Sequence, residues 1–292
     1  MSHRAGFVNI IGNPNVGKST IMNALTGEKL SIITSKAQTT RHRIMGIVNG
    51  EDFQIVYSDT PGIIKPKYKL QEAMMSFVKI ALSDADVILY VTDVKEDPSA
   101  EKEFRERIKA AAIPVIIAVN KIDLSNQEEL EKITSAWKGS FPESPVIPVS
   151  GLKKFNLETL LNAILSRLPV SEPYFPKDQL TDRYERFFAS EILREKILVN
   201  YRKEVPYSVE VEIESFTEEE KLTRIRALIH VARESQKGIL IGHRGSMLKK
   251  VGTEARQDME SFFGKKVFLE LYVRVTKDWR DKPAMLKRFG YR

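Results

Sequence analysis

The stretch Gly12-Asn13-Pro14-Asn15-Val16-Gly17-Lys18-Ser19 decides the fold of this chain. Its two glycines lie five positions apart and precede Lys and Ser, which is the pattern of a phosphate-binding loop. Glycines let the backbone curl around a phosphate chain with its N–H groups pointing inward. Lys18 can then reach the outer phosphates, and the Ser19 hydroxyl can ligate Mg²⁺. The pattern predicts a nucleotide site that runs from Gly12 to Thr20.

The flanking residues place this loop between a strand and a helix. Residues 7–11 are a short apolar run typical of a buried strand, and residues 19–25 have the pattern of a helix opening. A helix N-terminus attracts anions through its free N–H groups and its dipole. The loop therefore has the context that phosphate binding needs.

Composition excludes several classes of protein. The chain has 292 residues, which is typical of two domains, and its hydrophobic content of 42% is sufficient for ordinary cores. There are no cysteines, so disulfides, thiolate metal sites and cysteine nucleophiles are excluded, and a cytoplasmic location is expected. No apolar run approaches the length of a membrane span, and the short apolar start is too brief for a signal peptide.

The net charge of +7 is concentrated at the end of the chain. Residues 1–170 carry +2, residues 171–236 carry −3, and the last 56 residues carry +8. A basic C-terminal region favours binding to a nucleic acid or to an anionic membrane surface.

Two further segments can complete a magnesium and phosphate site. Thr39 and Thr40 lie in a polar loop before the next strand, where either hydroxyl can reach Mg²⁺. Residues 44–49 and 53–58 alternate like paired strands, and the second strand runs into Asp59-Thr60-Pro61-Gly62. A carboxylate at the C-terminal end of such a strand lies where open α/β sheets bind ligands. We expect Asp59 to hold Mg²⁺ through water and the Gly62 N–H to meet the γ-phosphate, with Lys18, Thr40 and Gly62 as the catalytic groups.

The tetrapeptide Asn120-Lys121-Ile122-Asp123 predicts selectivity for guanine. The Asp123 carboxylate can accept from both N1–H and the 2-amino group, which adenine lacks, and an unpaired buried carboxylate would strongly disfavour adenine. Asn120 can contact the base edge, and the Lys121 stem can lie across the base. Backbone N–H groups of Ser150-Gly151-Leu152 can bind the guanine carbonyl.

Apolar runs at residues 85–93, 113–120 and 145–149 alternate with helical segments, which is typical of parallel strands covered on both faces. The first domain is expected to be an α/β P-loop domain over residues 1–170, with a mostly parallel sheet. Residues 169–176 contain three prolines, and residues 171–182 are expected to form a stiff linker.

Residues 183–292 predict a smaller α+β domain in the order helix, strand, strand, helix, helix, strand. The turn Gly242-His243-Arg244-Gly245 joins its two central helices and opens the basic region. Such a turn is how a KH domain holds the backbone of about four single-stranded nucleotides. The predicted RNA-binding residues are the turn and its neighbours Ile239, Ile241, Lys249 and Lys250.

This combination of motifs resembles the Era family of bacterial GTPases, a Ras-like GTP-binding domain followed by a type II KH domain. The resemblance covers nearly the whole chain. It implies GTP hydrolysis, binding to the 3′ end of 16S ribosomal RNA, a role in assembly of the 30S subunit and some peripheral contact with the inner face of the cell membrane. We expect a monomer.

One position departs from the Ras pattern. Ras-type GTPases place a water-orienting Gln directly after the Gly of the Asp-x-x-Gly motif, but this chain has Ile63 there. His42 and Arg43 are conceivable substitutes. Relatives with Asn at the position of Asn15 can use a bound K⁺ as the charge stabiliser, which is the hypothesis that we favour.

Two alternatives remain open from the residues. A kinase or ATPase can use the same phosphate loop, although Asp123 argues against adenine. A nucleotide-dependent switch at a membrane surface can use the basic C-terminal region on anionic lipid.

Overall fold

The computed structural model describes residues 2–96 and 102–291, and the chain divides into two compact units. The first unit contains Met1–Ser31, Thr40–Lys65 and Met74–Asp182, and the second contains Ile32–Thr39, Pro66–Ala73 and Arg183–Arg292. Two short segments of the first predicted domain thus group with the second unit. The predicted boundaries of the domains and the linker stay a prediction. Among the described residues, no helix combines the length and apolar character needed to cross a bilayer.

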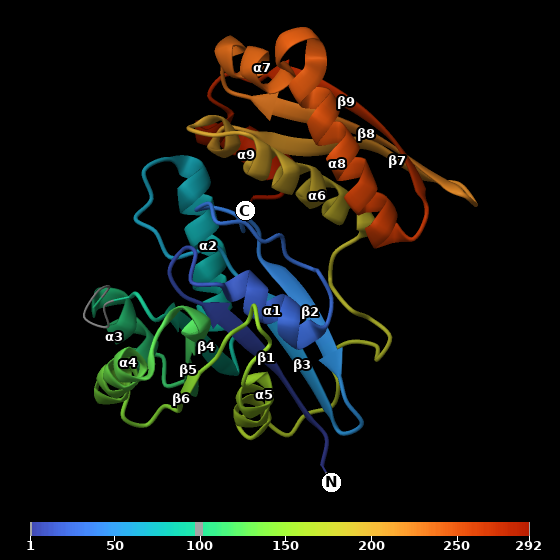
Figure 1. Cartoon of the computed structure of the whole chain (residues 1–292). Helices are drawn as coiled ribbons and strands as arrows, with labels where there is room; N and C mark the ends of the chain where they lie inside the picture. The colour runs from blue at the N-terminus through green and yellow to red at the C-terminus, as the bar shows by residue number, and fades with distance from the viewer. Residues whose placement is uncertain (1, 97–101, 292) are drawn as a thin grey trace. The chain divides into compact units, whose positions relative to one another are not determined.

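The first unit is built on a six-stranded sheet in the order β2-β3-β1-β4-β5-β6 (Figure 1). Only the β2–β3 pair is antiparallel, so the predicted mostly parallel sheet is confirmed. The strands are β1 (Arg4–Ile11), β2 (Ile44–Asn49), β3 (Phe53–Asp59), β4 (Val87–Asp93), β5 (Val115–Asn120) and β6 (Val146–Pro148).

Helices cover both faces of this sheet because its central strands are apolar on both sides. All seven residues of β4 are buried. On one face, β4 side chains pack with residues of α3 and α4 in a cluster that includes Tyr90, Ile108 and Trp137, whereas α1 and α5 lie on the other face (Figure 1). The helices are α1 (Lys18–Thr26), α2 (Lys69–Ser83), α3 (Lys102–Ala110), α4 (Gln127–Ser140) and α5 (Leu157–Leu165).

The segment predicted to be a linker runs along β2 and β3. The Gln54 side chain on β3 accepts from the backbone N–H groups of Tyr174 and Phe175 at 2.7 and 3.0 Å. The Thr181 hydroxyl donates to the Met45 carbonyl at 2.6 Å. These hydrogen bonds fix residues 174–181 to the first unit. They agree with the division of the chain, in which the first unit extends to Asp182.

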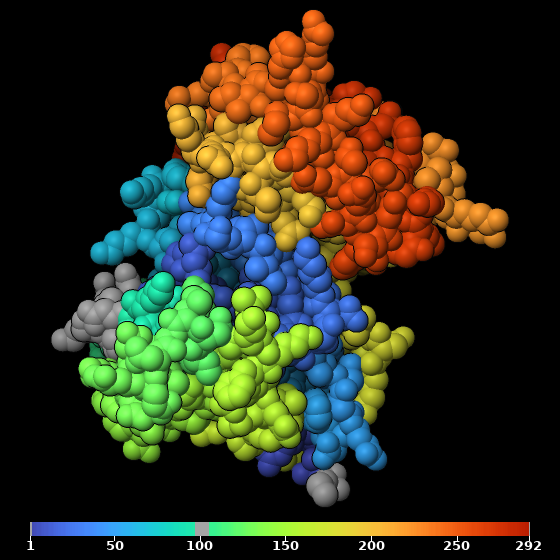
Figure 2. Space-filling view, viewed as in Figure 1, coloured from blue at the N-terminus to red at the C-terminus, as the bar shows by residue number. Residues whose placement is uncertain are grey.

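The second unit follows the predicted order of helix, strand, strand, helix, helix and strand. Its sheet has the order β7-β8-β9, with β7 antiparallel and β9 parallel to β8. The turn between β7 and β8 projects from the rest of this unit (Figure 2). The elements are α6 (Glu185–Asn200), β7 (Glu210–Glu218), β8 (Leu222–Val231), α7 (Glu234–Ile241), α8 (Ser246–Phe263), β9 (Lys266–Val275) and α9 (Pro283–Arg288).

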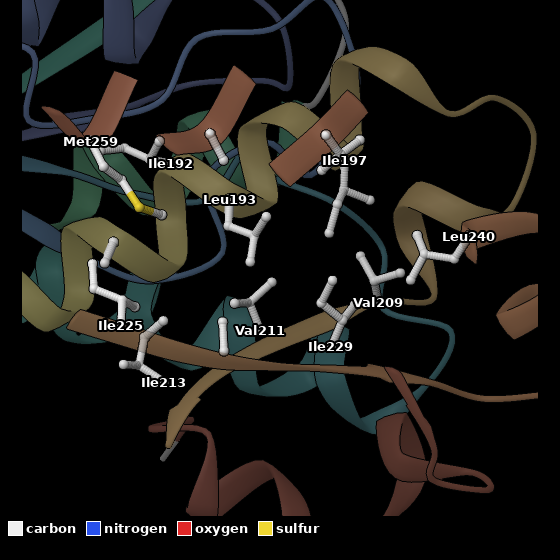
Figure 3. Packing of buried hydrophobic residues seen from close by; sticks show 14 of the residues in the cluster. Ile192, Leu193, Ile197, Val209, Val211, Ile213, Ile225, Ile229, Leu240 and Met259 are labelled. Carbon is white, nitrogen blue, oxygen red and sulfur yellow. The ribbon is translucent and has the colours of Figure 1, made fainter. Parts of the chain in front are cut away.

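The core of the second unit lies between one face of this sheet and helices α6 and α8 (Figure 3). Leu193 and Ile197 of α6 point toward Val211 and Ile229 of the strands, and Met259 of α8 closes one end (Figure 3). The alternation of β7 and β8 sends every second side chain into this core. The opposite face of the sheet is therefore free to carry charge.

Candidate nucleotide and RNA sites

The phosphate loop has the curled backbone that the sequence predicted. Gly17 has φ +93°, and Asn15 has φ +66°, so both lie in the left-handed region. The buried Lys18 ammonium donates to the carbonyls of Gly12 and Asn13 at 3.1 and 2.8 Å. Burial lowers the pKa of Lys18 to about 8, although Asp59 and Glu96 oppose the shift. The lysine is thus held in the loop as a desolvated cation, which strengthens its attraction for an anion.

Asn120 connects three loops of the site. Its side-chain N–H donates to the Val16 carbonyl at 2.8 Å, and its carbonyl oxygen accepts from the Gly151 N–H at 3.0 Å. A Cβ on Gly17 would lie 2.2 Å from Asn120 Nδ2. Gly17 is therefore needed for its positive φ and for this close approach. The Asn120 amide thus joins the phosphate loop to the base-end loop, and its predicted contact with the base edge stays a prediction.

Ser19, Thr40 and Asp59 meet at the C-terminal edge of the sheet. The Ser19 hydroxyl donates to Asp59 Oδ2 at 2.6 Å and lies 2.9 Å from the Thr40 hydroxyl, which donates to the same carboxylate oxygen at 3.2 Å. Burial raises the pKa of Asp59, against the opposing effects of Ser19 and Lys18. Among the described residues, Asp59 Oδ1 is buried without a hydrogen-bond partner. A buried carboxylate oxygen of this kind suits a cation, so these residues fit Mg²⁺.

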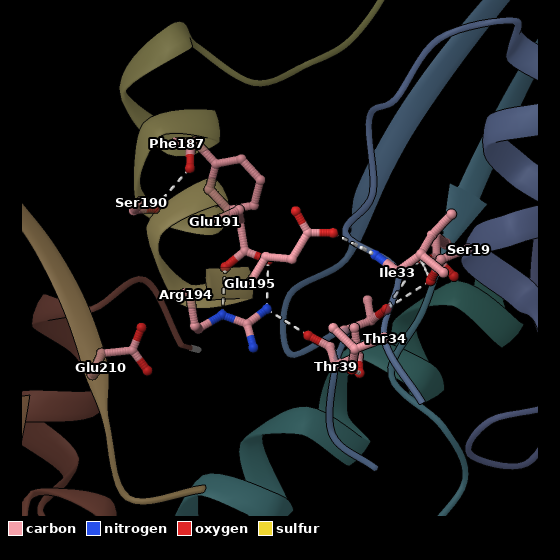
Figure 4. Close-up of polar contacts among 12 residues, drawn as sticks. Ser19, Ile33, Thr34, Thr39, Phe187, Ser190, Glu191, Arg194, Glu195 and Glu210 are labelled. Carbon is pink, nitrogen blue, oxygen red and sulfur yellow. Dashed lines mark hydrogen bonds and ion pairs between the residues drawn. The ribbon is translucent and has the colours of Figure 1, made fainter. Parts of the chain in front are cut away.

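The second candidate threonine makes different contacts (Figure 4). The Thr39 hydroxyl donates to the Lys36 carbonyl at 2.6 Å and contacts the Thr34 hydroxyl, and the Thr39 carbonyl accepts from Arg194. Burial alone lowers the pKa of Arg194, but the adjacent Glu191 carboxylate outweighs it and raises that pKa. Of the two predicted metal-binding threonines, the structure brings only Thr40 to Ser19 and Asp59.

The Asp-Thr-Pro-Gly motif begins at Asp59, the last residue of β3. The Thr60 hydroxyl donates to the Ile10 carbonyl at 2.8 Å, which fixes the segment to β1. A Cβ on Gly62 would lie 2.7 Å from the backbone of Pro14, so Gly62 approaches the phosphate loop closely. Pro61, which precedes Gly62 in the chain, is buried. Ile63 packs against the apolar cluster of α3 and α4. Its side chain is thus part of the core and has no polar role.

The base-end residues are brought together at the ends of β5 and β6. The Ser150 hydroxyl donates to Asp123 Oδ1 at 2.5 Å and orients this carboxylate. The Lys121 ammonium donates to the Asn15 carbonyl and lies 2.7 Å from Asp93 Oδ2. Leu152 is 73% exposed, and its backbone N–H is the group predicted to contact the base.

Two acidic residues of the site were missed by the sequence analysis. Asp93 ends β4 and pairs with Lys121; its position at the end of a buried strand was a signal that could have found it. Glu96 accepts from the Thr92 hydroxyl at 2.7 Å. Burial raises the pKa of Glu96, and hydrogen bonds from Thr92 and Asn13 oppose the shift. No motif marks Glu96, because only the fold brings it near the phosphate loop.

His42 and Arg43 have structural partners. Arg43 Nε donates to the Ser58 hydroxyl at 2.6 Å, and the same guanidinium contacts Asn9 at 3.2 Å and Asp84. The His42 ring is 5.9 Å from the Phe77 ring. Both side chains are buried. These contacts give neither residue the role of the missing Gln.

The predicted turn of the second unit has the geometry of a tight backbone approach. Gly242 has φ +73°, and a Cβ there would lie 2.7 Å from the Met247 side chain. His243 and Arg244 are exposed, with Arg244 at φ +49°. The Ile239 side chain is 51% exposed, whereas Ile241 is partly buried. Lys249 and Lys250 are exposed on the first turns of α8.

A groove of about 390 Å³ begins at this turn and separates α8 from β9. Of the predicted residues, Gly245 and Lys249 line it. The other residues that line the groove are Leu248, Gly252, Thr253, Arg256, Leu269 and Leu271. The apolar floor and the basic rim match the chemistry of bases and phosphates.

Comparisons with known proteins match both parts of the chain. Residues 7–121 match the family model described as 50S ribosome-binding GTPase, and residues 204–280 match the KH domain model. The chain is 45% identical to GTPase Era of Syntrophus aciditrophicus, covering 99% of this chain and 95% of that protein. It is also 45% identical to GTPase Era of Caldanaerobacter subterraneus, covering 100% and 99%.

Two solved structures resemble the whole chain. Era in complex with MgGDPNP and nucleotides 1506–1542 of 16S ribosomal RNA is 40% identical, with a TM-score of 0.95 and 99% of each chain covered. A variant of Aquifex aeolicus Era bound to GDP and AlF₄⁻ is 41% identical, with the same TM-score and coverage. The P-loop domain followed by a KH domain, together with full-length identity of this size, shows that the chain belongs to the Era family of GTPases.

Proposed function

We propose that this chain binds GTP at the phosphate loop and hydrolyses it to GDP and phosphate. The observation that carries this proposal is the convergence of Ser19, Thr40 and the buried Asp59 beside the Lys18 ammonium. Solved relatives hold MgGDPNP or GDP with AlF₄⁻, which supports the same chemistry here. The kinase and ATPase alternative is not favoured by these relatives.

Ser19, with Asp59 acting through water, would hold Mg²⁺, and Thr40 would complete the ligand set. When bound, Mg²⁺ neutralises the charge that develops on the transferring phosphoryl group. Lys18 and the inward N–H groups of the loop stabilise the same charge electrostatically. The Gly62 backbone approaches Pro14 of the phosphate loop, and its N–H would bind a γ-phosphate oxygen. Water attacks in line, and hydrolysis is slow because Ile63 cannot orient it.

Base selectivity is assigned to Asp123, which Ser150 orients. We expect Asp123→Asn to weaken GTP binding by about 2–4 kcal/mol, because a charged acceptor for two donors is lost. Xanthine nucleotides carry a carbonyl at the 2-position and should then bind better than guanine nucleotides. Titration with GTP, xanthosine triphosphate and ATP tests this, and an unchanged preference for GTP would refute the assignment.

Potassium is the proposed charge stabiliser in place of the missing Gln. Asn15 is exposed at the rim of the phosphate loop, where its amide oxygen can reach a cation. Replacing K⁺ by Na⁺ at constant ionic strength should lower the hydrolysis rate of the wild type but not of Asn15→Ala. Equal rates of the wild type in the two salts would remove Asn15 from the catalytic residues.

We further propose that the KH domain binds the 3′ end of 16S ribosomal RNA and that the protein acts in 30S subunit assembly. The complex of a 40% identical Era with nucleotides 1506–1542 supports this partner. The groove beside Gly242-His243-Arg244-Gly245 supplies the contact surface.

The double variant His243→Asp with Arg244→Asp tests the RNA site. It should abolish binding to single-stranded RNA while intrinsic GTP hydrolysis persists, because acidic side chains at the turn would face phosphate oxygens. Lys203→Asp with Lys277→Gln, at two exposed lysines of the second unit, lowers the net charge by the same amount and serves as the control. Wild-type affinity should also fall with added salt. Normal RNA binding by a folded double variant would refute the site.

We propose a cytoplasmic location, because ribosomal subunits are assembled there. Peripheral contact with the inner face of the membrane, through the basic C-terminal region, is a separate proposal. Flotation with anionic and neutral vesicles tests it, and RNA should compete if both ligands use the same basic surface. Equal recovery with both vesicle types would refute an electrostatic contact.

A further inference from the structure

The outer face of the β7-β8-β9 sheet carries two exposed aromatic rings on its edge strand. Along β9, Leu269 and Leu271 face the core and the groove, whereas Phe268 and Tyr272 point to the opposite side. Their side chains are 48% and 49% exposed. Phe268 and Tyr272 are four residues apart on one strand and so share one face. Exposed aromatic rings that are grouped on one face of a sheet indicate an interaction surface, because burying such rings would otherwise stabilise the fold.

Each ring is covered in part by an arginine from the neighbouring strand. The Arg224 guanidinium carbon is 5.5 Å from the centre of the Phe268 ring, and that of Arg226 is 5.6 Å from the centre of the Tyr272 ring. Glu219 pairs with Arg224 at 2.7 Å, and Glu270 pairs with Arg226 at 3.3 Å. All four charged side chains are at least one-third exposed. We name Arg224, Arg226, Phe268 and Tyr272 the outer platform.

The C-terminal segment covers the other end of the same face. Arg288 pairs with Glu212 at 2.8 Å, and the Phe289 ring is 4.9 Å from the His230 ring. Leu228 on β8 is only 2% exposed. The part of the sheet that remains open in the described chain is therefore the end that carries the outer platform.

We propose that the outer platform is a second contact surface for single-stranded RNA, continuing from the groove around the edge of β9. This inference rests on the RNA-binding function proposed above. In the described part of the chain, β9 pairs with β8 alone, so its other edge is open. The groove ends on Leu269 and Leu271, which are the neighbours of Phe268 and Tyr272 on the same strand. A nucleotide that leaves the groove thus has one strand to pass before it reaches the platform.

The chemistry of the platform fits nucleotides. Aromatic rings and guanidinium planes stack on any base, and arginines also contact phosphates. Lys266 and Arg274 lie at outward positions of β9, and Lys266 Nζ is 3.7 Å from Glu260 Oε2. The four cations Arg224, Arg226, Lys266 and Arg274 thus outnumber the three acids that pair with them, Glu219, Glu260 and Glu270. Cores of protein–protein interfaces are depleted in charge, whereas each ring here has a charged neighbour. A KH turn holds only about four nucleotides, which leaves any longer RNA without a partner beyond the groove.

The test compares two RNA lengths on the full-length protein. Fluorescence anisotropy would measure affinity for a single strand of about four nucleotides, which fills the groove, and for one of about ten, which extends past it. Wild type should bind the longer strand more tightly. Phe268→Ala with Tyr272→Ala should weaken binding of the longer strand by about fivefold to a hundredfold per ring and leave the shorter strand unaffected.

Three further variants separate stacking from other effects. Tyr184→Ala removes a ring that is 88% exposed elsewhere in the second unit and should change neither affinity. Phe268→Tyr with Tyr272→Phe keeps both planar rings and should bind like wild type, whereas leucine at both positions keeps apolar surface and should behave like alanine. Glu270→Gln removes the acid that pairs with Arg226 and should tighten binding of the longer strand.

Each remaining outcome contradicts the proposal. Equal weakening of both strands by the alanine variant would show that the groove itself was distorted. Full affinity of that variant for the longer strand would show that the platform binds no RNA and faces another partner. Wild-type binding that does not increase with length would refute the extension alone, and a wild type that binds neither strand would refute the RNA function as well.

Discussion

Asn120→Ala should destabilise the first unit even without nucleotide. The side chain is 2% exposed, and its two hydrogen bonds hold the Val16 carbonyl and the Gly151 N–H. Alanine leaves both backbone groups buried without these partners. Each unsatisfied group costs about 1–3 kcal/mol, so the free energy of unfolding should fall by about 2–6 kcal/mol in total. A side chain that served only to contact the base would have no such effect in the absence of the base.

The assay is urea unfolding of the nucleotide-free protein, followed by tryptophan fluorescence. The chain has two tryptophans, Trp137 in the first unit and Trp279 in the second. In a Trp279→Phe background, Trp137 reports on the first unit alone, because it packs against Tyr90 in that core. Asn120→Ala would be compared with its parent in this background.

Two comparisons make the result specific to the two hydrogen bonds of the Asn120 side chain, which we call the Asn120 bridge. Asn120→Asp keeps an acceptor for the Gly151 N–H but loses the donor to Val16, so its effect reports on that one bond and on the added charge. Asn126→Ala removes the exposed cap of α4, which should cost about 1 kcal/mol. If Asn120→Ala unfolds at the same urea concentration as its Trp279→Phe parent and loses only GTP affinity, the Asn120 bridge contributes no stability and our reasoning is wrong.

Three other predictions concern stability. Burial lowers the pKa of His230, and Glu212 opposes this shift. As pH falls, the unfolded state therefore binds a proton before the folded state does, so the second unit should lose stability below about pH 6.5. Unfolding measured across pH should show a smaller loss in His230→Gln. Leu193→Ala should cost the second unit about 2–5 kcal/mol in urea unfolding, because this side chain is fully buried. Arg43→Ala should lower the free energy of unfolding of the first unit by about 2–4 kcal/mol. This cost is at the low end for a broken buried ion pair, because the Asp84 side chain is 40% exposed. An unchanged hydrolysis rate per bound nucleotide would agree with a structural role for Arg43, and a large fall in that rate would contradict it.

The sequence by itself determined the architecture and the order of the site segments. The phosphate loop is contiguous, so its glycines, Lys18 and Ser19 can be read without any knowledge of the fold. Asp59 and Asn120 end buried strands, and the carboxyl ends of parallel strands share one edge of a sheet. The turn at Gly242 could be predicted from the sequence because its two glycines lie between two segments with helical patterns. These signals are local or follow from a general rule of sheet topology.

Only the tertiary structure decided which side chains share hydrogen bonds across long sequence separations. Asn120 bonds to Val16 over 104 residues, and Arg43 bonds to Asp84 over 41; neither pairing leaves a pattern in the sequence. Both Thr39 and Thr40 were candidates for the metal, and the loop conformation brings the Thr40 hydroxyl to Ser19 and Asp59. The pairing of Arg224 with Phe268 depends on the register between β8 and β9, which is fixed by packing of the whole sheet and not by either strand alone.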